Sequence, residues 1–181
     1  MIGPDEVLSF WFDGDLGRSR TVWFDEDAAF DAGCARFSQA RDAAKRYALD
    51  HWTDTPRGAL ALIILLDQVS RNLHRGSAEA FAADAKARDI AQSAIARGFD
   101  QAVPPAARVF FYLPFEHAED PTAQDCSVRL FEPLGGDDAR YARLHRDVIA
   151  RFGRFPGRNV ALGRISTPAE EAYLTNAHRE F

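Results

Sequence analysis

The chain has 181 residues, enough for one domain whose hydrophobic core needs no metal or disulfide to hold it together. Its net charge of -5 and isoelectric point near 5.5 argue against a general nucleic-acid binder, because a phosphate backbone demands a basic surface. No apolar run approaches the roughly 20 residues that span a bilayer, and the two cysteines, Cys34 and Cys126, form no CxxC pair. We therefore expect a single domain over residues 1–181, not inserted in a membrane, in a reducing cytoplasm.

Helical patterns run along the chain, and no segment alternates as a strand would. The first predicted helix covers residues 4–13, and the second covers about residues 25–49. Thr55-Pro56 predicts an N-cap with proline in the first turn of a third helix, which Arg75-Gly76 ends. Residues 60–66 are apolar on every side of this helix, so we expect other helices to cover it all round.

Five more helices are predicted in the rest of the chain, most of them opened by proline or a capping residue. They cover about residues 77–98, 104–113, 121–134, 136–152 and 167–174. We expect Pro114 to end the second of these, because proline lacks the amide that a helix interior uses. The fold class is therefore all-α, with about eight helices joined by short connections and packed as antiparallel pairs.

Near the end of the third helix, Asp67, Arg71 and Arg75 recur at four-residue spacing, with Asn72 beside them. This spacing places the three charged groups on one helix face. A carboxylate at the boundary of the core needs a partner, and a guanidinium can hold a carboxylate or phosphate through two parallel donors. The cluster predicts either an anion site or a structural ion pair that ties neighbouring helices together.

A second polar cluster is the segment Glu116-His117-Ala118-Glu119-Asp120. A histidine beside carboxylates can have its tautomer fixed and its pKa raised, which suits acid–base chemistry near neutral pH. In this hypothesis His117 is the general acid or base and Glu119 orients it. Alternatively, Asp120 caps the next helix and the other residues form a solvated turn. No HExxH or zinc deaminase pattern is present, and we predict neither a metal nor a cofactor.

The third cluster is rich in arginine and is shaped by glycines and Pro156. A tight turn of this kind can direct backbone amides inward, and with several guanidinium groups it describes an anion-binding concavity. The alternative is a solvated basic loop, or a loop paired with Glu116, Glu119 and Asp67. The residues of this cluster are Arg151, Arg154, Arg158, Asn159 and Arg164.

Four groups of residues then occur together in a fixed order. They are Leu66-Asp67-Gln68 with Arg71-Asn72, Arg75-Gly76 with Phe81 and Asp84, Leu113-Pro114-Phe115 with His117 and Glu119, and Arg151-Phe-Gly-Arg-Phe-Pro with Arg158-Asn159. Jointly they resemble the bacterial family catalogued as domain of unknown function 924, from about Val7 to Leu174. The resemblance implies an all-helical, tetratricopeptide-like fold and brings no established reaction, cofactor or partner. This chain has Gly157 where the family usually has histidine, and Ala118 where it usually has serine.

Three hypotheses for the function follow. In the first, an Arg-rich pocket binds a small anionic ligand. In the second, the same pocket belongs to a hydrolase-like enzyme that uses His117 as acid or base, with Glu119 beside it. In the third, the helices form a tetratricopeptide-like scaffold that presents a concave surface to a peptide. The predicted ligand-binding residues are Asp67, Arg71, Asn72, Arg75, Arg151, Arg154, Arg158, Asn159 and Arg164.

Overall fold

A helix that is buried along most of its length forms the centre of the protein. In the computed structural model, which describes residues 2–25 and 27–176, the side chains of residues 58–70 are all buried. The Thr55 hydroxyl accepts a hydrogen bond from the Gly58 amide at 3.1 Å, and Pro56 occupies the first turn, as the sequence predicted. The helix has three consecutive parts, which are α4 (Pro56–Ile63), the π-helical segment η4 (Ile64–Val69) and α5 (Ser70–Leu73).

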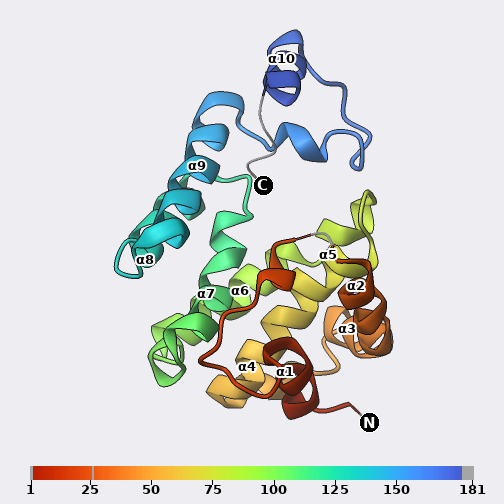
Figure 1. Cartoon of the computed structure of the whole chain (residues 1–181), viewed down its shortest axis with the longest axis vertical. Coiled ribbons are helices and arrows are strands. Elements are labelled where there is room, and N and C mark those ends of the chain that lie inside the picture. The colour runs from red at the N-terminus through yellow and green to blue at the C-terminus, as the bar shows by residue number, and fades with distance from the viewer. Residues whose placement is uncertain (1, 26, 177–181) are drawn as a thin grey trace.

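Five helices cover this central helix, which explains why its sequence is apolar on every side (Figure 1). Helices α1, α6 and α7 pack against α4. Helices α3 and α6 pack against η4, and α2 packs against α5. Aromatic rings fill much of the space between α1 and α7, where Trp11 and Phe12 both contact the ring of Phe110. The covering helices are α1 (Pro4–Phe12), α2 (Ala28–Cys34), α3 (Ser38–Lys45), α6 (Asp84–Ala96) and α7 (Pro105–Glu116).

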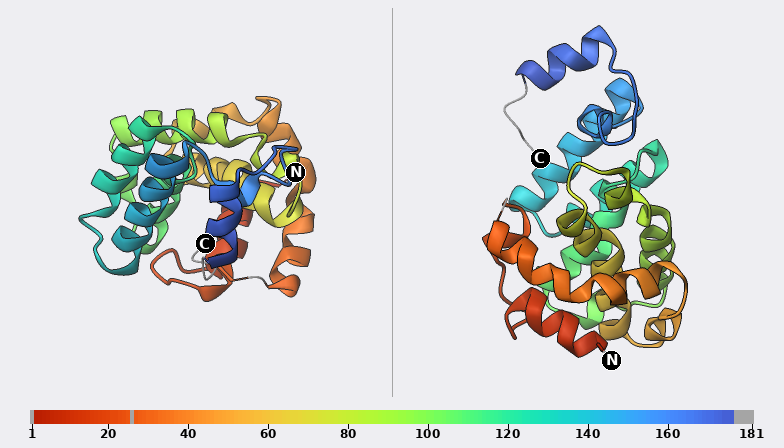
Figure 2. Two further views of the ribbon diagram at one scale, coloured as in Figure 1. Left: turned by 90° about the horizontal axis from the view of Figure 1, so that it is seen from above. Right: turned by 90° about the vertical axis from the view of Figure 1, so that its right-hand side faces the viewer.

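The last three helices extend the molecule away from α1 (Figures 1 and 2). Helix α8 (Pro121–Phe131) packs between α7 and α9 (Gly136–Phe152) as neighbouring antiparallel helices. The chain after α9 makes a single 3-10 turn, η7 (Pro156–Arg158), and then reaches α10 (Pro168–Asn176) at the upper end of Figure 1. A small second apolar cluster, formed by Val148, Ile149, Phe155, Phe152 and Tyr173, holds this end together.

The all-α prediction is confirmed, and no strand occurs within residues 2–25 and 27–176. The described part of the chain contains ten α-helical segments, and they make eight helices when α2 with α3, and α4 with α5, are each taken as one interrupted helix. The described helices include none long and apolar enough to cross a membrane. The tetratricopeptide-like packing stays a prediction.

Several predicted helix boundaries were wrong. The helix expected to end near residue 49 ends at Lys45, the last residue of α3, and the chain then turns with Tyr47 at a positive φ of 67°. Helix α7 continues past Pro114 to Glu116, because proline removes one amide donor while the next bonds still form, such as His117 N to Leu113 O at 2.8 Å. The helix expected to begin near Ser77 starts instead with the 3-10 turn η5 (Ala78–Phe81), and α6 begins only at Asp84.

Candidate functional site

The centre of the site is a pair formed by Asp67 of η4 and His117 at the C-terminal end of α7. Nδ1 of His117 lies 2.8 Å from Oδ1 and 3.0 Å from Oδ2 of Asp67, although the residues are 50 positions apart in the sequence. An ionised carboxylate only accepts hydrogen bonds, so Nδ1 carries the proton and Nε2 carries the lone pair of the neutral ring. Within the described residues Nε2 of His117 makes no hydrogen bond.

Two arginines lie next to this pair and share one carboxylate. Arg71 binds Asp84 through two parallel bonds of 2.9 Å and also lies 3.0 Å from Oδ1 of Asp67. Arg158 donates to the carbonyl oxygen of His117 at 2.9 Å, and its Nη1 is 3.6 Å from Asp84. Both guanidinium groups lie over the ring of Phe81, Arg158 at 4.6 Å and Arg71 at 5.6 Å from the ring centroid. Arg71 and Arg158 therefore lie on the same side of the molecule.

The pair is buried at one end and open at the other. Asp67 is 1% exposed, whereas the side chains of His117 and Arg158 are each 15% exposed and that of Asp84 is 18% exposed. The Gln68 amide donates to Oδ2 of Asp67, so the carboxylate has three side-chain donors around it. The part of this group that reaches the surface therefore belongs to His117, Arg158 and Asp84, and the Asp67 carboxylate lies beneath them.

Burial and charge set the protonation states of this group. Burial opposes ionisation of Asp67, but Arg71 and His117 outweigh it and hold the pKa of Asp67 below its usual value. Burial lowers the pKa of His117, and the opposing effect of Asp67 does not fully restore it, so the ring is neutral at neutral pH. Burial, helped by Arg71, lowers the pKa of Arg158 to about 10, which leaves it charged.

A second buried pair lies behind His117. His145 of α9 is 8% exposed and places Nδ1 at 2.9 Å from the carbonyl oxygen of Tyr141 and 3.5 Å from Glu116. Its ring centroid is 6.3 Å from that of His117. Burial lowers the pKa of His145 to about 3 and raises the pKa of Glu116 to about 8, so both side chains are uncharged at neutral pH.

Glu119 does not contact His117. Its carboxylate binds Arg164 through bonds of 2.7 and 2.9 Å and accepts a further bond of 2.8 Å from the Phe155 amide. Asp67 occupies the position beside the imidazole that the sequence hypothesis gave to Glu119. Glu119 instead fixes the chain between α9 and α10, and this chain carries Arg158 to the site.

The other predicted residues bind partners outside this group. Asn72 and Arg75 both bind the Asp31 carboxylate of α2. Nδ2 of Asn72 donates to Oδ1 at 2.6 Å, and Nε of Arg75 donates to Oδ2 at 2.6 Å. Arg154 binds Glu170 through two bonds of 2.6 and 2.8 Å. Arg151 lies over the rings of Phe152 and Tyr173, and Asn159 is buried with its amide donating to Ser166. The structure thus brings together Asp67, His117, Arg71 and Arg158, but not all the arginines.

Sequence reasoning missed Asp84 as a member of the site and His145 as a neighbour of His117. In the sequence Asp84 appeared only as part of a family motif. Its position at the first residue of α6, one turn after Phe81, could have indicated that it binds an arginine of the site. His145 follows the apolar spacing of α9, which is typical of a core residue, and it is buried. No group of three or more histidine, cysteine or acidic side chains within the described residues is arranged to hold a metal ion.

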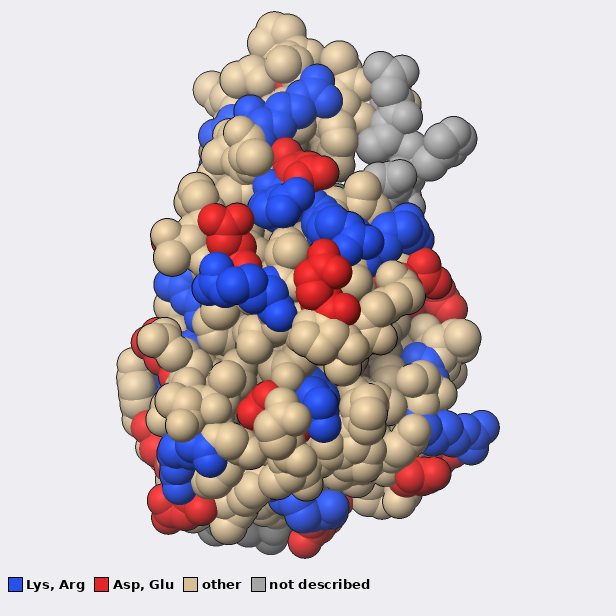
Figure 3. All heavy atoms as spheres, turned by 90° about the vertical axis from the view of Figure 1, so that its left-hand side faces the viewer, with Lys and Arg blue, Asp and Glu red and all other residues tan. Residues whose placement is uncertain are grey.

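Many arginines elsewhere are also paired. On the face shown in Figure 3, which carries α8 and α9, basic and acidic side chains lie beside one another. Examples are Arg143 with Glu132 at 2.6 Å and Arg140 with Asp137 at 3.1 Å. On α8 and α9, arginines such as Arg140 and Arg143 are therefore paired with neighbouring acids and do not form a free basic surface.

Comparisons with known proteins agree with the fold. The family model described as "Bacterial protein of unknown function (DUF924)" matches residues 7–178. A solved structure of a protein of unknown function from Agrobacterium tumefaciens is similar, with 47% sequence identity and a TM-score of 0.91. The match covers 96% of this chain and 97% of that one. A search of curated proteins found no match.

Proposed function

The chain belongs to the DUF924 family of bacterial proteins of unknown function, and from its own side-chain geometry we propose that it binds a small anionic ligand at His117 and Arg158. One observation carries this proposal. Arg158 makes no close bond to a carboxylate of its own, since the nearest carboxylate oxygen, on Asp84, is 3.6 Å away and belongs to a group that Arg71 already binds through two bonds. Arg71, Arg75, Arg154 and Arg164 each have a carboxylate oxygen within 2.9 Å or less.

The surroundings of Arg158 favour a ligand with a carboxylate or phosphate group. The guanidinium is held between the rings of Phe81 and Phe155, at 4.6 Å from each centroid, so its plane is fixed before a ligand arrives. A planar guanidinium in a fixed orientation offers parallel donors to two oxygens of such a group. Its partial burial strengthens the attraction compared with an exposed arginine.

Thermal unfolding in the presence of chosen anions tests this proposal. The panel contains inorganic phosphate, nucleoside monophosphates and dicarboxylates, and an anion at about 100 times its Kd stabilises the protein by about 2.7 kcal/mol. We expect Arg158→Gln to lose the stabilisation. Arg151→Gln is the matched control, because Arg151 is an exposed arginine of the same region that only contacts Phe152 and Tyr173. A stabilisation that survives Arg158→Gln, or a panel without any stabilising anion, would contradict the proposal.

A second function is favoured by the Asp67–His117 pair. A neutral imidazole whose Nδ1–H is held by a carboxylate presents the Nε2 lone pair as a general base. We propose that His117 takes a proton from a hydroxyl group or water beside the bound anion, while Arg158 stabilises the negative charge that develops. In this proposal Asp67, rather than Glu119, orients the imidazole.

Hydrolysis assays separate catalysis from binding. Phosphate and carboxylate esters of the anions that stabilise the protein are the substrates to try. His117→Gln should abolish turnover and keep most of the thermal stabilisation by the anion, because Arg158 still binds it. Turnover that persists in His117→Gln would exclude His117 from the chemistry while leaving the binding proposal intact.

A further inference from the structure

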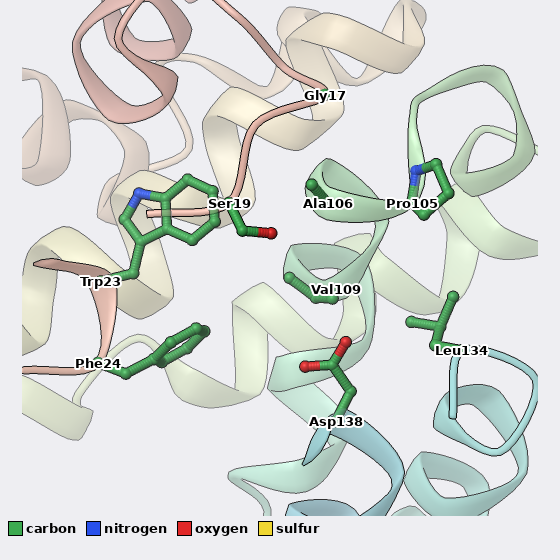
Figure 4. A pocket seen from close by; sticks show the side chains of 9 residues that line it. All are labelled: Gly17, Ser19, Trp23, Phe24, Pro105, Ala106, Val109, Leu134 and Asp138. Carbon is green, nitrogen blue, oxygen red and sulfur yellow. The ribbon is translucent and has the colours of Figure 1, made fainter. Parts of the chain in front are cut away.

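A pocket of about 360 Å³ lies on another part of the molecule, and none of its lining residues belongs to the His117 site. It is bounded by the chain that follows α1, by the 3-10 turn η1 (Thr21–Trp23), and by the first turns of α7 and α9 (Figure 4). Trp23 and Phe24 line one side, Leu134 lines the other, and Val109 lies at the back. This volume is within the range of sites that hold small organic molecules.

Asp138 is the one charged residue among those that line the pocket. Figure 4 shows its carboxylate and the Ser19 hydroxyl pointing toward the middle of the pocket. No hydrogen bond or ion pair joins Asp138 to any of the described residues, and the side chain does not cap the amides of α9, although it lies in the first turn. Burial, together with the neighbouring Asp137, raises the pKa of Asp138, as expected for a carboxyl group that lacks a counter-charge.

The apolar walls complement this carboxylate. Trp23 uses its indole N–H to bind the carbonyl oxygen of Trp11 at 2.8 Å, so a ligand meets the ring and not a free donor. Phe24 is 64% exposed and lines the pocket, so much of its ring is accessible to a ligand. A cation near an aromatic face and a carboxylate is attracted by both, and an apolar body gains from leaving water.

We propose that this pocket binds a small organic ammonium ion, with its cationic group at Asp138 and its apolar body against Trp23, Phe24 and Val109. An anion is disfavoured because Asp138 would repel it, and a neutral molecule would leave the Asp138 carboxylate half-buried without a partner. The proposal is independent of the anion site at His117 and Arg158, and it assigns the opposite ligand charge to a different place in the fold.

Titration of the ¹⁵N-labelled protein, followed by NMR at neutral pH, tests this inference with 2-phenylethylammonium as the probe. The matched ligand is 2-phenylethanol, which has the same ring and chain without the charge. We expect the ammonium ion to shift the amide signals of Trp23, Phe24, Val109 and Asp138, and to bind about tenfold more tightly than the alcohol. Rising salt concentration should weaken the binding of the ammonium ion and not that of the alcohol.

Three variants make the outcome decisive. Asp138→Asn should weaken ammonium binding about tenfold, while Asp137→Asn is the matched control, because Asp137 is exposed and does not line the pocket. Phe24→Ala removes an exposed ring and should weaken both ligands without unfolding the protein. Equal binding of the alcohol and the ammonium ion, unchanged binding by Asp138→Asn, or shifts confined to another surface would overturn the proposal. The absence of any shift up to the solubility limit of the probe would also overturn it.

Discussion

Replacing Glu116 by glutamine should make the protein more stable in mildly alkaline solution and leave it unchanged in mildly acidic solution. Glu116 is only 4% exposed, and its contact with Nδ1 of His145 is long, at 3.5 Å. Burial, with smaller contributions from Asp138 and Asp67, raises its pKa from the ordinary 4.5 to about 8. A rise of this size corresponds to about 5 kcal/mol of disfavoured ionisation, because each tenfold change in acidity is worth about 1.4 kcal/mol.

The direction of the pH effect follows from which state binds the proton more tightly. Between about pH 4.5 and pH 8 the folded protein keeps the Glu116 proton and the unfolded chain releases it. The contribution of Glu116 to stability is therefore fully present below about pH 4.5 and is lost as the pH rises to about 8. Near pH 7 the expected loss is about 3 kcal/mol, which is large compared with the 5–15 kcal/mol that stabilises a typical protein.

Urea unfolding followed by circular dichroism at about pH 5 and about pH 8 measures this loss. The Glu116→Gln variant has no titrating group at this position, so its free energy of unfolding should fall less between the two pH values than that of the wild type. Glu171→Gln is the control, because Glu171 is exposed. If the wild type and Glu116→Gln lose the same free energy between the two pH values, Glu116 is not protonated in the folded protein and the reasoning is refuted.

Substitutions at four further positions have expected outcomes. Asp67→Asn should lower the pKa of His117 further, measured by NMR titration of the imidazole, because the charge of Asp67 favours the protonated ring. The same variant should lower the free energy of unfolding by about 2–4 kcal/mol, since a buried charge-assisted network loses its acceptor. Asp120→Ala should lower the free energy of unfolding in urea by about 1 kcal/mol, because the Asp120 carboxylate caps α8 by accepting from the Ala123 amide at 2.8 Å. Asp120→Asn should keep most of this stabilisation, because asparagine is also a good N-cap. Glu119→Gln should speed proteolysis between residues 153 and 167 while α1–α7 stay resistant, because it weakens the paired bonds to Arg164. Gly157→His should change unfolding by less than about 0.5 kcal/mol, because a Cβ at this position meets no atom within 4 Å.

The helices could be predicted from the sequence because their causes are local. The Thr55 and Asp120 caps are formed as the sequence predicted. Thr167 and Glu170 bind each other's amides in a capping box, which the pattern Thr-x-x-Glu favours. The continuation of α7 through Pro114 and the π-helical form of η4 could not be predicted in this way. Both depend on tertiary packing around a buried segment, which overrides local preference.

The candidate site was predictable where contacts follow helical spacing and not where they cross the fold. Arg71 lies four residues after Asp67 in one helix, and the expected ion pair forms at 3.0 Å. The same spacing placed Arg75 on that face, but α5 ends at Leu73, so the chain turns and Arg75 reaches Asp31 of α2. The pairing of Asp67 with His117 depends on how α7 packs against the central helix, and no spacing in the sequence encodes that.

The arginines of this chain mostly join distant segments, and this limits what an Arg-rich sequence implies about ligands. Arg154 with Glu170, and Arg164 with Glu119, each connect parts of the chain that are far apart in sequence. A guanidinium that already has a carboxylate partner gains little from a second anion, because the ligand must displace or share that partner. Arg158 differs in degree, because the rings of Phe81 and Phe155 and a carbonyl oxygen orient the group, while its nearest carboxylate, on Asp84, is 3.6 Å away and already bound by Arg71. The number of arginines therefore says little about anion binding here, whereas the place of Arg158 beside His117, half-buried between two rings, makes it the candidate.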